Sequence, residues 1–168
     1  DGRRTVGTNM IRRLIANQEH TVTIRQEHGS AESETTFLDP NGAQVVGVGS
    51  DSVIVLNNEQ IVNATVRNED GSSSQEIMPD FMILGHELVH ALRGMGGYIK
   101  TDTGYYDYTS YTGEVVPNVE ARREELETTG ISYYYGSNTI NAWYWQTTEN
   151  TLRDEQGLRR RVTYASET

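Results

Sequence analysis

The stretch HELVH, residues 86–90, carries two histidines and a glutamate at a spacing that suits a zinc ion. On a helix, residues four apart lie on the same face, so His86 and His90 can direct their imidazoles at one ion. Glu87 is displaced by one position, which places its carboxylate beside the ion, where a general base accepts a proton from water. Burying these three groups without partners would be costly. The motif therefore predicts a hydrolytic zinc site rather than an ordinary core helix.

A catalytic zinc site needs a third protein ligand and an open fourth position. No histidine follows His90 and the chain has no cysteine, so the third ligand must be a carboxylate. Helix geometry does not choose among the carboxylates of the acid-rich segment 119–127, because three of them share one broad face. At least two of the four would then form only a solvated face. The candidates are Glu120, Glu124, Glu125 and Glu127.

The two remaining histidines, His20 and His28, serve as a comparison. They flank a predicted strand and have no partner at the spacing of metal ligands. We expect both to be surface histidines without a role in the site.

Two predicted helices would position the site. The first spans about residues 79–93, with Pro79 in its first turn and a glycine-rich stop at Gly94, Gly96 and Gly97. The second spans residues 116–130, opens at Pro117 and Asn118, closes at Gly130, and would carry the third ligand. Packing of these two helices against each other is what the zinc site requires.

The rest of the chain reads as a mixture of helix and strand. A helix capped by Thr8 is predicted over residues 8–18, and a short one begins near residue 148. Segments rich in β-branched residues predict strands at 21–26, 43–49, 52–56, 60–66 and 159–166. Polar or glycine-rich segments predict irregular connections at 28–50, 68–76 and 98–113.

Length and charge limit the classes of function. The chain of 168 residues suits a single domain over residues 1–168. A formal net charge of −10 and a pI near 4.8 disfavour nucleic acids and anionic membranes as partners. No apolar run approaches the roughly 20 residues of a membrane span. Since the chain starts at Asp1 rather than at a methionine, we expect it to be the C-terminal fragment of a longer protein.

Several motifs together resemble a known catalytic set. HELVHA is followed by EELETTG, which contains Glu124 and Glu125, and then by TEN, which contains Glu149, and RRVTY, which contains Arg161 and Tyr164. Their order and spacing over about residues 79–164 resemble the clostridial neurotoxin light chains. They are closer still to the NleD-type effector metalloproteases, a bacterial family that also occurs as C-terminal toxin domains of Rhs-like polymorphic toxins.

The resemblance assigns a role to each of these residues. It implies that Glu125 is the third zinc ligand, supported by Glu124, and that Glu149 orients a ligand histidine. It implies that Arg161 and Tyr164 stabilise the oxyanion. Plainer alternatives are a helix N-terminus for Glu149, a solvated basic run with Arg159 and Arg160 for Arg161, and a packed strand ring for Tyr164.

The combined expectation is an α+β, zincin-like domain, with a small mixed or antiparallel sheet packed on the HExxH helix. By resemblance we expect a Zn²⁺-dependent endopeptidase, a monomer translocated by a bacterial secretion system into a host or competitor cell, where it cleaves a protein. A carrier protein and a cognate immunity protein are possible partners. Two alternatives stay open: a protease that processes its own carrier, and a noncatalytic interaction domain stabilised by zinc.

Overall fold

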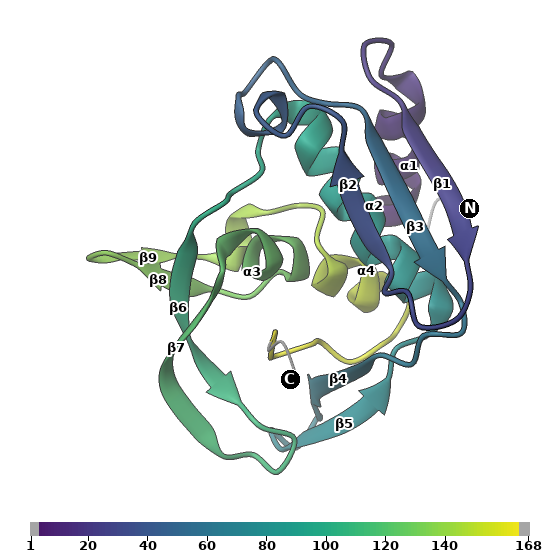
Figure 1. Cartoon of the computed structure of the whole chain (residues 1–168). Helices are drawn as coiled ribbons and strands as arrows, with labels where there is room; N and C mark the ends of the chain where they lie inside the picture. Colours follow the sequence, from purple (N-terminus) through teal and green to yellow (C-terminus); the bar gives the residue numbers. More distant parts are fainter. Residues whose placement is uncertain (1–3, 165–168) are drawn as a thin grey trace.

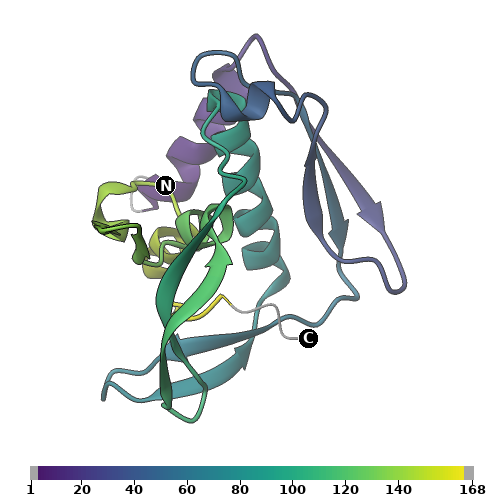
Figure 2. The ribbon, with the colours of Figure 1, turned by 60° about the vertical axis from the view of Figure 1, so that its left-hand side comes forward.

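The computed structural model describes residues 4–164 of the chain, and its central element is the helix α2 (Asp80–Gly96). Figure 1 shows a three-stranded sheet lying across this helix, and Figure 2 shows the other helices on the opposite side of α2 from the sheet. The helices that contact it are α1 (Thr5–Ala16), α3 (Arg123–Thr129) and α4 (Glu149–Glu155).

The three-stranded sheet has the order β1-β3-β2 and is mixed. The strand β1 (Val22–Glu27) pairs in parallel with β3 (Ser52–Asn57), whereas β2 (Glu34–Phe37) pairs antiparallel with β3. The edge strand β2 and the central strand β3 both contact α2. This arrangement places one free sheet edge directly beside the HExxH helix. A single 3-10 turn, η1 (Gly42–Gln44), lies between β2 and β3.

Two further groups of strands complete the structure. The hairpin β4 (Asn63–Arg67) and β5 (Ser73–Ile77) leads into α2. A four-stranded antiparallel sheet has the order β7-β6-β8-β9, and in Figure 1 it lies on the far side of α3 and α4 from β1-β3-β2. Its strands are β6 (Thr103–Thr109), β7 (Val115–Arg122), β8 (Tyr133–Tyr135) and β9 (Asn138–Ile140), followed by the 3-10 turn η2 (Ala142–Tyr144).

The helix α2 is held on nearly all sides. The carbonyl of Pro79 accepts from the amides of Met82 and Ile83, and Gly97, with φ 81°, ends the helix in the left-handed conformation. Its apolar side chains, including Val89, pack against β3, β4 and α4 in the main hydrophobic cluster. Because α2 is buried in this way, the polar groups it carries must be satisfied within the protein.

The expected class, α+β with a small mixed sheet packed on the HExxH helix, is confirmed. That residues 1–168 form one domain stays a prediction. Within residues 4–164, no helix is both long and apolar enough to cross a membrane.

Several sequence expectations were wrong because tertiary pairing overrides local pattern. Residues 116–122 form strand β7 rather than the first half of a helix, because they pair with β6, itself predicted to be irregular. Pro117 is tolerated there since β7 is an edge strand. Segment 43–49 is a turn rather than a strand, while β2 and β5 lie in segments predicted to be connections.

The boundaries of several elements also differ from expectation. The first helix begins at Thr5 rather than near Thr8, and α2 continues through Gly94 to Gly96. In place of a strand over 159–166, only Arg161 forms an isolated bridge, to Val66, and residues 165 and 166 lie outside the described residues. The helix near residue 148 and the strands around 21–26, 52–56 and 60–66 are confirmed within a few residues.

Candidate active site

His86, His90 and Glu125 direct one atom each at a common point. The Nε2 atoms of the two histidines are 3.1 Å apart, and Glu125 Oε2 lies 3.3 Å from His86 Nε2 and 3.2 Å from His90 Nε2. The histidines lie one turn apart on α2, and Glu125 comes from the first turn of α3. Tetrahedral zinc, with bonds of about 2.0–2.2 Å to nitrogen and oxygen, separates its ligand atoms by roughly 3.3 Å. The cluster therefore has the dimensions of a three-ligand zinc site.

The hydrogen-bonding pattern also fits a cation. Each imidazole has a glutamate on its Nδ1 atom, so each Nδ1 donates and each Nε2 presents a lone pair. Two lone pairs and a carboxylate oxygen then face one another in a buried site, which is unfavourable unless positive charge lies between them. A metal ion held by His86, His90 and Glu125 would satisfy this donor set.

The pKa shifts have the same cause. Burial alone would lower the pKa of both imidazoles, but Glu125 and Glu149 raise that of His86, and Glu124 and Glu125 raise that of His90 to about 10. Burial would likewise raise the pKa of the Glu125 carboxyl, yet the two histidines hold it far below its ordinary value. The site attracts positive charge, whether from protons or from a metal.

Glu149 contacts His86 at Nδ1, the ring nitrogen that faces away from His90 and Glu125. Its Oε1 lies 2.9 Å from His86 Nδ1 and accepts from Arg161 Nη1 at 3.1 Å. Burial would raise the pKa of Glu149, but the charge of Arg161 and the contact with His86 keep it well below its usual range. The carboxylate therefore remains an acceptor that fixes the tautomer of His86.

Glu124 supports His90 in the same way. Its Oε1 lies 3.1 Å from His90 Nδ1 and accepts from the hydroxyl of Thr128 at 3.1 Å. Its Oε2 accepts from the backbone amide of Lys100 at 3.1 Å. Burial would raise the pKa of Glu124, whereas the contact with His90 lowers it. Adjacent residues of one helix thus serve the two nitrogens of His90: Glu124 contacts Nδ1 and Glu125 contacts Nε2.

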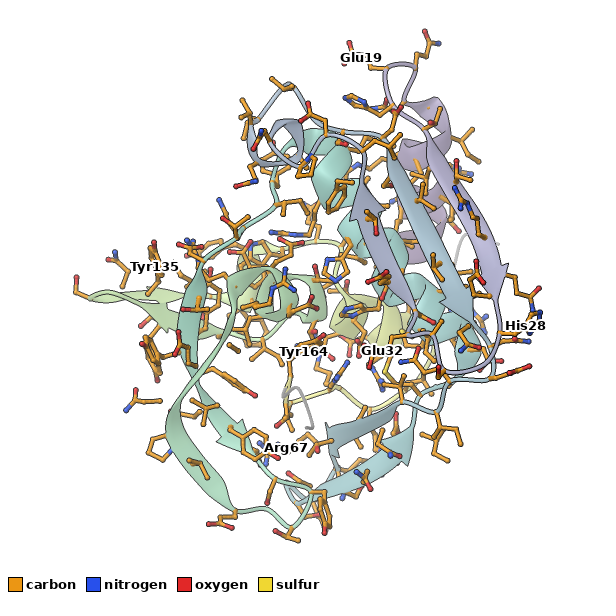
Figure 3. All side chains as sticks on the ribbon, viewed as in Figure 1. Glu19, His28, Glu32, Arg67, Tyr135 and Tyr164 are labelled. Atoms are coloured by element: carbon orange, nitrogen blue, oxygen red, sulfur yellow. The ribbon has the colours of Figure 1, made fainter. Side chains whose placement is uncertain are left out.

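Glu87 faces the cleft beside the metal ligands. Its carboxylate accepts a hydrogen bond from the Thr35 hydroxyl on β2, with 2.7 Å between Thr35 Oγ1 and Glu87 Oε2. Two cavities of about 280 and 400 Å³ share His86, Glu87, Tyr164 and Glu32 as lining residues. Figure 3 labels Glu32 and Tyr164, which line both cavities. The Glu87 carboxylate thus lies in a cleft that passes over the His86, His90 and Glu125 cluster.

Arg161 and Tyr164 lie on the same cleft. The guanidinium carbon of Arg161 is 4.9 Å from the centre of the Tyr164 ring, and this ring stacks on His86 with 6.1 Å between centroids. Burial, together with the nearby charge of Glu125, raises the pKa of Tyr164 above its ordinary value. The hydroxyl therefore keeps its proton and can act as a donor.

The other candidates are separated from this cluster. Glu120 is exposed on β7 and accepts from the Thr103 hydroxyl, while Glu127 is buried and accepts from the Tyr133 hydroxyl. His20 contacts the Val48 carbonyl and Asp51, and His28 pairs with Glu59 at the outer edge of the three-stranded sheet (Figure 3). Arg159 and Arg160 are partly exposed and pair with Glu76 and Asp154.

Sequence reasoning missed four residues whose side chains contact this site: Thr35, Arg93, Thr128 and Arg153. Arg93 contacts Glu124, and Arg153 contacts Glu149. A usable signal existed for Arg153, since it follows Glu149 at the i,i+4 spacing of helical ion pairs. No such sequence signal pointed to Thr35, because its segment was predicted to be an irregular connection.

The chain was compared with solved structures and with families of known proteins. Two solved structures that it matches are the botulinum neurotoxin serotype C1 light chain protease and the botulinum neurotoxin type D light chain. The first is 21% identical with a TM-score of 0.41, and 66% of this chain covers 28% of it. The second is 17% identical with a TM-score of 0.46, and 77% of this chain covers 40% of it. The chain thus spans less than half of either structure.

A search of the curated proteins finds no match. A family model, that of the Peptidase M91 effector proteins, matches residues 2–164, which is nearly the whole chain and includes every residue of the metal cluster. This match confirms the resemblance to bacterial effector metalloproteases that the motifs predicted. The chain belongs to the Peptidase M91 effector protein family.

Proposed function

We propose that the chain is a zinc-dependent endopeptidase that acts as a secreted effector or toxin on a protein of another cell. The observation that carries this proposal is the convergence of His86 Nε2, His90 Nε2 and Glu125 Oε2 to within 3.3 Å of one another, beside a carboxylate in a cleft. Three protein ligands leave a fourth position for water or substrate, as catalytic zinc sites require. The effector family supports delivery into a target cell.

In this proposal, each side chain around the cleft has a separate role in peptide hydrolysis. Zinc held by the three ligands would polarise the scissile carbonyl and make water a stronger acid. Glu87 accepts the proton of the attacking water and then delivers it to the departing amine. Arg161 and Tyr164 donate to the oxygen on which negative charge develops. Glu149 and Glu124 hold the histidines in the tautomer that presents Nε2 to the metal.

The metal site is tested by elemental analysis of the desalted protein. We expect about one zinc per chain in the parent protein and markedly less in Glu125→Ala. Glu120→Ala is the matched control, because Glu120 belongs to the same acid-rich segment but lies exposed on β7. No zinc in the parent, even after zinc is added back, would overturn the proposed site.

The reaction is tested with the variant Glu87→Gln. We expect it to bind zinc like the parent but to lose turnover by at least about a thousandfold, because the general base is absent. New protein N-termini are mapped in a cell extract incubated with the parent and with the variant. Undiminished cleavage by Glu87→Gln would show that Glu87 is not the base.

A carrier protein, an immunity protein and a monomeric state stay predictions.

A further inference from the structure

Glu149, which fixes the orientation of His86, is itself held by a buried arginine. While Glu149 Oε1 serves His86 and Arg161, its Oε2 accepts from Arg153 Nε at 2.7 Å. Both Glu149 and Arg153 have a relative exposure of 0%. Arg153 is therefore placed against the one carboxylate oxygen that neither the histidine nor Arg161 occupies.

Arg153 is anchored from the other side as well. Its Nη1 donates to Glu76 Oε1 on β5 at 2.6 Å and to the carbonyl of Arg159 at 3.1 Å. These contacts join α4, β5 and the segment after α4. They hold the guanidinium in place, so it cannot move with the Glu149 carboxylate if that carboxylate rotates. Because Arg153 occupies Oε2, Arg161 can contact only Oε1 of Glu149. Arg161 therefore cannot form a bidentate ion pair with Glu149 that would draw it away from the cleft.

The histidine on the next turn of α2 also contacts a glutamate that is paired with an arginine, here through both carboxylate oxygens. Glu124 Oε1, which contacts His90 Nδ1, accepts from Arg93 Nε at 2.9 Å, and its Oε2 accepts from Arg93 Nη2 at 3.1 Å. Arg93 Nη2 also donates to the carbonyl of Tyr98 at 3.0 Å, beyond the end of α2. Each ligand histidine is thus backed by a glutamate that an arginine clamps.

We propose that Arg153 and Arg93 are positioning residues for the metal, acting through Glu149 on His86 and through Glu124 on His90. This inference rests on the zinc site proposed above. Without Arg153, Glu149 Oε2 would have no partner, and without Arg93, Glu124 would keep only the Thr128 hydroxyl and the Lys100 amide besides His90. A less firmly held carboxylate can rotate, and rotation would weaken its hold on the Nδ1 proton. The clamps remove that freedom, so the two Nε2 lone pairs remain aimed at one point. Loss of such support typically weakens metal binding by about 10- to 100-fold.

The test measures the zinc dissociation constant by competition with a chelator. We expect Arg153→Met to raise this constant at least about tenfold. Arg159→Met is the matched control, because Arg159 also pairs with Glu76 but does not contact Glu149, and we expect its zinc affinity to stay within about twofold of the parent. Arg93→Met is compared with Arg123→Met, since the side chain of Arg123 is also largely buried and pairs with Asp102 and Tyr133 but does not contact Glu124.

A double-mutant cycle separates positioning from general stability. If Arg153 acts through Glu149, Glu149→Gln with Arg153→Met should bind zinc no more weakly than Glu149→Gln alone. Additive losses, or a lower melting temperature with an unchanged zinc affinity in Arg153→Met, would overturn the inference. Absence of zinc from the parent would instead overturn the proposed function.

A milder variant keeps the test valid if the methionine variant does not fold. Arg153→Lys preserves the positive charge, but one ammonium group cannot span both Glu149 and Glu76 in the way the guanidinium does. We expect a dissociation constant several-fold above that of the parent, and a parental value would contradict the proposed clamp.

Discussion

The hydroxyl of Thr35, on the edge strand β2, donates to the carboxylate of Glu87 across a distance of 2.7 Å, and so ties the three-stranded sheet to the glutamate of the HExxH motif. Its Oγ1 is also 3.0 Å from the Glu87 backbone carbonyl, so the same side chain lies against the first turn of the HExxH motif. Strand β2 therefore contributes a group that fixes the orientation of the Glu87 carboxylate, the proposed general base.

Replacing Thr35 by valine should lower kcat by about tenfold, because a hydrogen bond to a charged group is lost while the shape and strand preference are kept. Zinc content should not change, since Thr35 does not contact a metal ligand through its side chain. Steady-state kinetics with zinc analysis of the same samples checks both. Thr35→Ser retains the hydroxyl and should recover most of the activity; a serine variant as slow as the valine variant would argue against this role.

Tyr164 should act through its hydroxyl rather than its ring. The variant Tyr164→Phe keeps the stacking on His86, and we expect kcat to fall about a hundredfold with little change in zinc affinity, as for loss of one oxyanion donor. Tyr108→Phe provides the control, since Tyr108 packs in the same cluster as Tyr164. Equal rates for Tyr164→Phe and the parent would leave oxyanion stabilisation to Arg161.

The metal-free protein should lose stability as the pH rises. The carboxylates around His90 raise its pKa in the fold from 6.5 to about 10, although burial opposes this. Because the folded pKa is the higher one, protonated His90 stabilises the fold fully below about pH 6.5, and the stabilisation disappears as pH rises through about 10. Thermal unfolding of chelator-treated protein across this range should show a falling melting temperature.

Two comparisons identify the group responsible for that pH dependence. His90→Gln removes the titrating ring, so its melting temperature should change less with pH than that of the parent. Bound zinc should have a similar effect, because a metal ligand no longer takes up the proton. A melting temperature that is constant or rises toward pH 10 in the metal-free parent would contradict the assignment.

The chemistry of the site could be predicted from the sequence better than the fold around it. His86 and His90 are four apart on a helix whose ends, Pro79 and the glycines after Arg93, are visible in the sequence, so one local rule places both imidazoles. Glu125 lies on a different helix, and helix geometry could not separate it from its three acidic neighbours. Only the spacing shared with a known family distinguished it, and the structure does place its carboxylate beside both histidines.

The missed strands show where local pattern is insufficient. Strand β2, with the sequence ETTF, has only four residues, and its neighbours are polar and glycine-rich. Its pairing with β3 is a long-range contact, as is the pairing of β7 with β6. Such pairings are decided by partners distant in sequence, which no short window contains. Thr35 was missed for this reason, although its side chain contacts the Glu87 carboxylate.

The end of α2 provides a test of how the fold supports the site. Gly97 has a φ of 81°, and a Cβ atom there would overlap the Val45 carbonyl oxygen, so Gly97→Ala should combine a left-handed strain of about 1–2 kcal/mol with a backbone clash. Gly113→Ala is the control, because Gly113 has a φ of 88° with nothing within 4 Å and should show the strain alone.

We therefore expect Gly97→Ala to lower the melting temperature considerably more than Gly113→Ala. It should also weaken zinc binding, because Tyr98, whose carbonyl accepts from Arg93, directly follows the shifted residue. Thermal unfolding and chelator competition measure the two effects separately. Equal losses of stability in the two variants would mean that the contact between Gly97 and the Val45 segment adjusts at little cost, and that this segment does not fix the end of the metal-binding helix.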